Sequence, residues 1–146
     1  MYTNNQQKSK TKMKRILFLI TMAACVTLVS AQSKRQLRVT YILEQMQMDN
    51  ATVAKVKPTI VAFIDALANN KDKHDEVQDK YQAAEEKGTL TDAQAEILMQ
   101  SKFNKDAGEL EVRRQYYARL KNIVGAAKAR RILALSNDKL NKAQKQ

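Results

Sequence analysis

The sequence predicts an all-α protein: an elongated antiparallel helical hairpin with one long helix, about residues 92–124, and shorter flanking helices. The composition supports this class, because 146 residues include only three glycines and one proline, while Ala, Lys, Gln and Leu are abundant. Apolar residues also recur at helical spacing in several segments. Residues 92–124 contain no proline and a single glycine, Gly108. The length corresponds to one domain.

The first 31 residues have the pattern of a secretory signal peptide. A basic run, residues 12–15, precedes an apolar stretch over residues 16–29, and the small residues before Gln32 form a cleavage site. The apolar stretch is too short to span a membrane. Because the polar residues before Met13 add nothing to this signal, Met13 is a possible true start. We expect a periplasmic or secreted mature chain, without a transmembrane segment, with one helical domain over residues 32–140 and a disordered tail over 141–146.

A second interpretation of this segment makes Cys25 a lipid-anchored cysteine, because Met22-Ala-Ala-Cys25 loosely fits a lipoprotein box. The long apolar run after the cysteine favours cleavage after Ala31 instead. The mature chain would then contain no cysteine, and therefore no disulfide, no thiol nucleophile and no cysteine-ligated metal.

Charge is unevenly distributed along the chain. Residues 1–31 hold five of the 26 Lys and Arg and no acid, so the mature chain has 21 basic and 15 acidic residues, a net charge of +6. Residues 71–111 have 11 acids and 6 bases, whereas residues 112–146 have 1 acid and 10 bases. Export argues against a nucleic-acid partner, so the basic segment is interpreted as a face for acidic protein segments, anionic lipid or the chain's own acidic middle.

Two helices are expected before the acidic middle. Residues 34–48 form the first, and an apolar stripe between Val53 and Leu67, capped by Asn50, forms the second. Pro58 lies within the second helix and predicts a kink rather than a stop. Residues 69–72 (NNKD) are expected to form a turn.

The polar residues 72–87 are expected to form either a short exposed helix or a frayed connection. They include His74, the only histidine, with Asp72, Asp75 and Asp79 close in sequence. A metal site needs several converging ligands. Solvated charges on an exposed helix are the favoured interpretation, and we expect no metal and no other cofactor.

The segment after Gly88 starts the long helix. Leu90, Thr91 and Gln94 have the spacing of a capping box, in which the threonine hydroxyl and the glutamine amide each bond a free backbone N–H group. Leu90 stands where a hydrophobic staple residue belongs. As chemistry, this motif starts a helix and nothing more.

The apolar line of the long helix is expected to pass through Met99, Phe103, Leu110, Tyr117 and Leu120. At 1.5 Å per residue the helix spans about 50 Å, longer than a compact domain of this size is wide. We therefore expect an antiparallel partner helix or a second subunit, giving a homodimer, to cover this line. A final helix follows Gly125 and extends to about Leu140.

A cluster of arginines and tyrosines near the end of the long helix is a candidate protein-binding surface. It consists of Arg113, Arg114, Tyr116, Tyr117 and Arg119. Adjacent tyrosines point about 100° apart on a helix, so one is expected to pack and the other to lie at a rim. Arg and Tyr suit protein binding, but arginines that extend over a helix into solvent are an equal alternative.

The motif Leu90-Thr91-x-x-Gln94 resembles that of the periplasmic Spy/CpxP group, the LTxxQ proteins. Residues 41–58 (YILEQMQMDNATVAKVKP) look like that group's first helix pair, and residues 111–124 (EVRRQYYARLKNIV) look like its long helix with paired tyrosines. The chain departs from the pattern at residues 48–52, where only the capping role of a first LTxxQ copy survives, through Asp49 or Asn50.

The resemblance implies a periplasmic, chaperone-like protein that holds unfolded clients, or an envelope-stress accessory protein. Two alternatives are a metal-responsive member of that group, which the scarcity of His, Cys and Met clusters disfavours, and a structural or adaptor protein of the envelope with one dedicated partner. Because the mature chain has one histidine, no cysteine and no glycine-rich phosphate loop, we expect no enzymatic activity.

Overall fold

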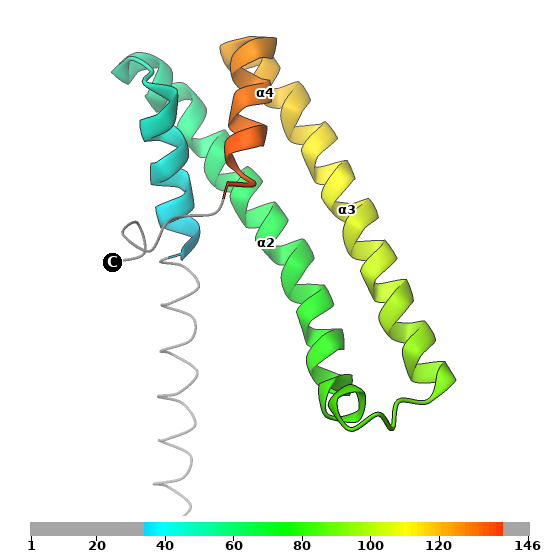
Figure 1. Ribbon diagram of the computed structural model, residues 1–146. Helices are drawn as coiled ribbons and strands as arrows, with labels where there is room; N and C mark the ends of the chain where they lie inside the picture. The colour runs from blue at the N-terminus through cyan, green and yellow to red at the C-terminus, as the bar shows by residue number, and fades with distance from the viewer. Residues whose placement is uncertain (1–33, 139–146) are drawn as a thin grey trace, which may run out of the picture. The chain divides into compact units, whose positions relative to one another are not determined.

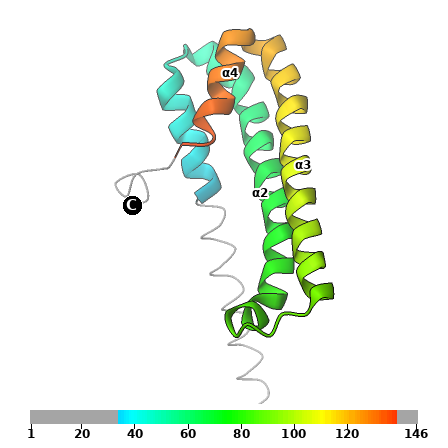
Figure 2. The same cartoon turned by 45° about the vertical axis from the view of Figure 1, so that its right-hand side comes forward.

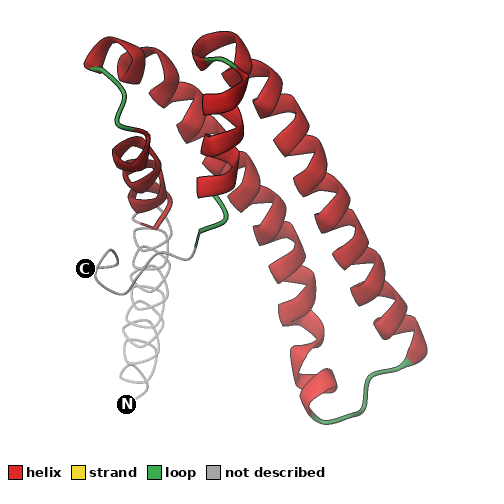
Figure 3. Cartoon of the chain, turned by 45° about the horizontal axis from the view of Figure 1, so that its top comes forward, coloured by secondary structure: helices red, strands yellow, loops and turns green. Residues whose placement is uncertain are grey.

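A computed structural model describes residues 34–138, which form four helices and no strand (Figures 1 and 3). The helices are residues 34–46, α2 (Asn50–Glu86), α3 (Asp92–Val124) and α4 (Ala126–Leu135). The predicted all-α class is confirmed. The expectations for the signal peptide, for Cys25 and for the tail over residues 141–146 lie outside the described residues.

α2 and α3 lie side by side and run in opposite directions, joined by the short connection over residues 87–91 (Figures 1 and 2). α3 has the bounds that the sequence predicted, but α2, with 37 residues, is longer than α3, with 33. α2 continues through Pro58. Its N-cap is Asp49 rather than Asn50, and the Asp49 carboxylate accepts from the Thr52 backbone N–H at 2.8 Å.

The turn predicted at residues 69–72 is wrong, because α2 is helical through this segment. Polar side chains in this part of α2 form hydrogen bonds and ion pairs with neighbouring helices instead of bonding to their own backbone. Asn70 donates to the backbone carbonyl of Lys105 on α3 at 2.7 Å. Arg35, on the 34–46 helix, forms ion pairs with Asp65 at 3.7 Å and Asp72 at 2.7 Å. These contacts offset the weak helix propensity of asparagine and aspartate.

The apolar core lies at one end of the α2–α3 pair, where the 34–46 helix and α4 also pack. Ile42, Ile60, Phe63, Leu120 and Ile132 are fully buried there. Because all four helices contribute to this cluster, each covers the apolar side of the others. No described helix has an apolar window long enough to cross a membrane.

The segment that follows α4 is held against the 34–46 helix by polar contacts to Asp138. Arg38 donates to the backbone carbonyl of Asp138, and the Tyr41 hydroxyl donates to the Asp138 carboxylate at 3.0 Å. The hydrogen bond to that carboxylate raises the pKa of Tyr41, because removing its proton would place a second negative charge beside the first.

Candidate functional site

The outward face of α3 carries large apolar side chains that nothing in the described chain covers. Met99, Phe103 and Leu110 retain 45%, 57% and 50% of their accessible surface. Spacings of 4 and 7 residues place the three on one face of the helix. We call them the exposed stripe. Scattered apolar residues are ordinary on a protein surface, but an aligned set on one helix is a feature of binding surfaces.

Of the two covers predicted for this line, an antiparallel partner helix or a second subunit, the first is not found, because α2 packs on another side of α3. The side of α3 that faces α2 instead carries small or polar residues in its first half, among them Ser101 and Gly108. A Cβ at position 108 would overlap the side chain of Asn70, so glycine permits this close approach of the two helices. Leu98 is buried and Ile97 lines the space between the helices, whereas Met99, Phe103 and Leu110 are left facing outward.

The predicted arginine and tyrosine surface is divided by the structure. Tyr116 is buried and packs against Phe63, with ring centroids 5.5 Å apart, while Tyr117 is half-buried. One tyrosine therefore packs and the other lies at the rim, as expected. Arg114 and Arg119 are exposed, and the Arg119 guanidinium lies 4.9 Å from the Tyr116 ring centroid.

Arg113 does not belong to an open surface. Its guanidinium is paired with Glu109 at 2.8 Å, and it donates to the Leu133 carbonyl at 3.3 Å and to the Ser136 hydroxyl at 3.2 Å. A further donation reaches the side chain of Asn137. These bonds connect α3 to the C-terminal end of α4, where helix carbonyls lack intrahelical partners. Arg113 therefore caps the C-terminal end of α4 and holds it against α3.

The capping box at the start of α3 is formed by Thr91 and Gln94. The Thr91 hydroxyl accepts from the Gln94 backbone N–H at 3.3 Å, and the Gln94 side-chain oxygen accepts from the Thr91 backbone N–H at 3.0 Å. Leu90 precedes the pair and is half-buried. All three residues lie in or beside the connection, and their contacts define where α3 begins.

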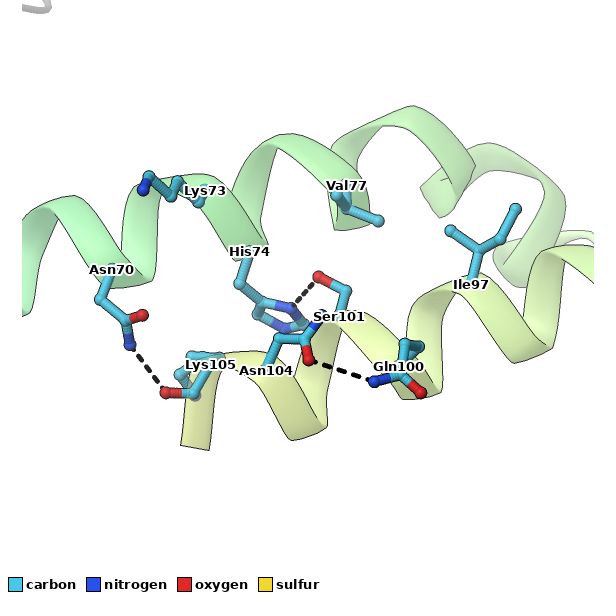
Figure 4. A pocket seen from close by; sticks show the side chains of 9 residues that line it. All are labelled: Asn70, Lys73, His74, Val77, Ile97, Gln100, Ser101, Asn104 and Lys105. Carbon is cyan, nitrogen blue, oxygen red and sulfur yellow. Dashed lines mark hydrogen bonds between the residues drawn. The ribbon is translucent and has the colours of Figure 1, made fainter. Parts of the chain in front are cut away.

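A groove of about 440 Å³ lies between α2 and α3, near the connection (Figure 4). Its lining combines two lysines, one histidine, amide and hydroxyl groups and two aliphatic side chains: Asn70, Lys73, His74, Val77, Ile97, Gln100, Ser101, Asn104 and Lys105. His74 Nδ1 lies 2.9 Å from the Ser101 hydroxyl oxygen. This groove could not be predicted from local sequence, because facing residues such as His74 and Ser101 lie 27 positions apart.

His74 therefore faces Ser101 on the neighbouring helix rather than a group of acids. Within residues 34–138, no cluster of three or more His, Cys, Asp or Glu side chains has the geometry to hold a metal ion. Asp75, one of the acids considered beside His74, forms an ion pair with Lys71 on its own helix.

No family model, no curated protein and no solved structure matches this chain. The resemblance to the Spy/CpxP group accordingly remains a prediction from the motif and its flanking segments. The features of the described residues that suit binding are the exposed stripe, Arg114 beside it, and the groove.

Proposed function

We propose that this protein is a secreted, periplasmic binding protein that holds unfolded or partly folded clients, with the exposed stripe of α3 as the main contact surface. One observation carries the proposal: three large apolar side chains, each about half exposed, align on the outer face of a long helix. Aligned apolar groups on a rigid helix can contact many different apolar client segments without requiring one defined partner.

An exposed cation beside the stripe suits the same role. Arg114 lies one helical turn after Leu110 on α3 and is exposed, so it can attract acidic client segments before apolar contact forms. Arg119 is also exposed, but at 100° per residue it points about 180° away from Leu110. Such attraction is screened within about 8 Å at physiological salt. Capture should therefore slow as salt rises, while clients already bound remain held through apolar contacts.

The α2–α3 hairpin, in this proposal, is the rigid unit that presents the stripe, and two copies associate as a homodimer that leaves the stripe open to clients. The protein acts by binding and not by catalysis. Sedimentation of the stripe variant described below would test the assembly, because conversion of a dimer into a monomer would identify the stripe as a subunit interface instead.

Aggregation of a chemically unfolded client, diluted from denaturant and followed by light scattering, tests the proposal directly. The variant Met99→Ser, Phe103→Ser, Leu110→Ser should lose most of the protection, with affinity lowered about 10- to 100-fold, because the removed apolar area contributes roughly 1–3 kcal/mol in total. The control variant Val61→Ser, Ile123→Ser removes apolar side chains that are 37% and 38% exposed elsewhere. Equal protection by the stripe variant and the control would contradict the proposal.

An adaptor with one dedicated partner is the second candidate function, and the groove between α2 and α3 favours it. A groove with a defined order of charged and apolar groups is better suited to one kind of ligand than to many. Retrieval of a single tight partner, without suppression of client aggregation, would distinguish the adaptor from the client-holding protein.

A further inference from the structure

The groove between α2 and α3 has an ordered chemistry along its length. Figure 4 shows Val77 and Ile97 at one end, the His74–Ser101 pair in the middle, and Lys105 at the other end, with Lys73 above it on α2. None of the nine lining residues is acidic, although residues 71–111 carry 11 acids and only 6 bases. The most acidic segment of the chain therefore contains a groove without an acidic lining residue, although Asp106 pairs with Lys105 at 3.9 Å.

The middle of the groove supplies hydrogen-bonding groups. Asn104 accepts from the Gln100 side chain at 3.1 Å, which orients its amide and leaves the Asn104 NH₂ as a donor. When the Ser101 hydroxyl donates to His74 Nδ1, the histidine proton resides on Nε2, and the ring has a second donor. Lys73 and Lys105 add two ammonium groups, of which that of Lys105 also lies 3.9 Å from the Asp106 carboxylate. This set of donors and cations is complementary to a carboxylate.

From these observations we infer that the groove binds an extended peptide segment in which an apolar residue is followed, within two or three positions, by Asp or Glu. The lining residues of each helix span about seven positions, or roughly 10 Å, the length of about three extended residues. The carboxylate would lie between Lys73 and Lys105, and the apolar side chain between Val77 and Ile97. A small inorganic anion would leave that aliphatic pair uncovered.

This inference is independent of the proposed client-holding function. At 100° per residue, Ser101 of the groove and Phe103 of the exposed stripe point about 160° apart on α3. The two surfaces can therefore be altered separately, and failure at one does not imply failure at the other.

His74 provides a direct readout, because it is the only histidine in the chain. The imidazole resonances of the purified protein can be followed by NMR at neutral pH and constant ionic strength. The probe is an acetylated five-residue peptide with one leucine and, two residues later, one glutamate. We expect a saturable movement of the His74 signal with this peptide, and none with peptides in which lysine replaces the glutamate or glycine replaces the leucine.

Charge reversal in the groove should weaken that binding about tenfold or more, since two attractive charges become repulsive. The test variant is Lys73→Glu, Lys105→Glu, and the control is Lys57→Glu, Lys102→Glu, which makes the same change in net charge outside the groove. Retained helical circular dichroism would show that both variants fold.

Three results would overturn the inference. The first is no saturable movement of the His74 signal. The second is the same movement with acetate alone, which would indicate a simple anion site. The third is equal weakening by the two charge-reversal variants, which would indicate a general effect of net charge.

Discussion

The two ends of the α2–α3 pair are built differently, although the same two helices form both. At the core end, the 34–46 helix and α4 join the pair, and Ile42, Phe63 and Ile132 are fully buried. At the loop end, α2 and α3 are the only helices among residues 34–138. Between residues 65 and 115, all of which the structure describes, Leu98 is the only buried residue.

The difference is a matter of geometry. Two helices in contact can cover only the strip along which they touch, so a side chain is enclosed only where a third or fourth element covers its remaining side. The loop end is consequently held by a thin contact with polar pairs such as Asn70–Lys105 and His74–Ser101. It also carries the exposed stripe and the groove. Stability is concentrated at one end of the pair and candidate binding chemistry at the other.

The largest expected effect is at the core end. Phe63→Ala should lower the free energy of unfolding by about 3–5 kcal/mol, because it removes a fully buried ring and leaves a cavity. Leu98→Ala at the loop end should cost roughly 2 kcal/mol or less, since the site can collapse or admit water. Denaturant unfolding with unchanged slopes measures both changes. Equal losses for the two variants would contradict the contrast between the ends.

The next largest loss of stability is expected when the bonds between Arg113 and α4 are removed. Arg113→Ala should cost about 1.5–3 kcal/mol, because partly buried, charge-assisted bonds to Glu109, Leu133 and Ser136 are lost. Its neighbour Arg114 is exposed, so Arg114→Ala should change stability by no more than about 0.5 kcal/mol. The measurement is again denaturant unfolding, with Arg113→Lys as a second variant that should not restore the full loss, since lysine lacks the planar fork. If Arg114→Ala lowered the free energy of unfolding as much as Arg113→Ala, Arg113 would not have the proposed role of holding α4 against α3.

Because α2 and α3 approach closely where Asn70 meets Gly108, substitutions at these two positions should have smaller and mutually dependent effects on stability. Asn70→Ala should cost about 1 kcal/mol through the lost bond to Lys105. Gly108→Ala should be nearly neutral alone, because a gain in helix propensity of about 1 kcal/mol is offset by displacement of Asn70. In the Asn70→Ala background the same substitution should stabilise by about 1 kcal/mol. A double-mutant cycle measures the coupling, and additive effects would show that the two residues do not meet.

The smallest effect concerns pH at the start of α2. The hydrogen bonds that Asp49 accepts from the Thr52 side chain and backbone lower its pKa in the folded state. The ionised cap therefore stabilises the fold above the unfolded-state pKa of about 3.9, and this contribution is lost as pH falls through the lower folded pKa.

Comparison with Asp49→Asn isolates this contribution, because asparagine also caps a helix but does not titrate. The stability advantage of the wild-type protein should shrink between neutral pH and about pH 3, as measured by thermal unfolding. Asp79→Asn, a substitution of an exposed acid within α2, serves as the control. An advantage that stays constant or grows towards acid pH would contradict the assigned role of Asp49.

Local sequence signals predicted the helical class and both bounds of α3, but not that α2 continues to Glu86. The bounds of α3 follow from Gly88, the Thr91–Gln94 capping box and Gly125, because caps and glycines act through the adjacent backbone. The start of α4 directly after Gly125 was also predicted, although the helix ends at Leu135 and not at about Leu140. These features depend on interactions within a few residues along the chain.

Tertiary structure alone decided which face of α3 is covered and whether residues 69–72 turn or continue as helix. The sequence contains two possible faces on α3, one with Met99, Phe103 and Leu110 and one with Ser101 and Gly108. α2 packs on the second, because small residues allow the two helices to approach closely. Residues 69–72 remain helical because Asn70 bonds to α3 and Asp72 pairs with Arg35. Both outcomes depend on partners more than 30 residues away, and local pattern carries no information about such partners.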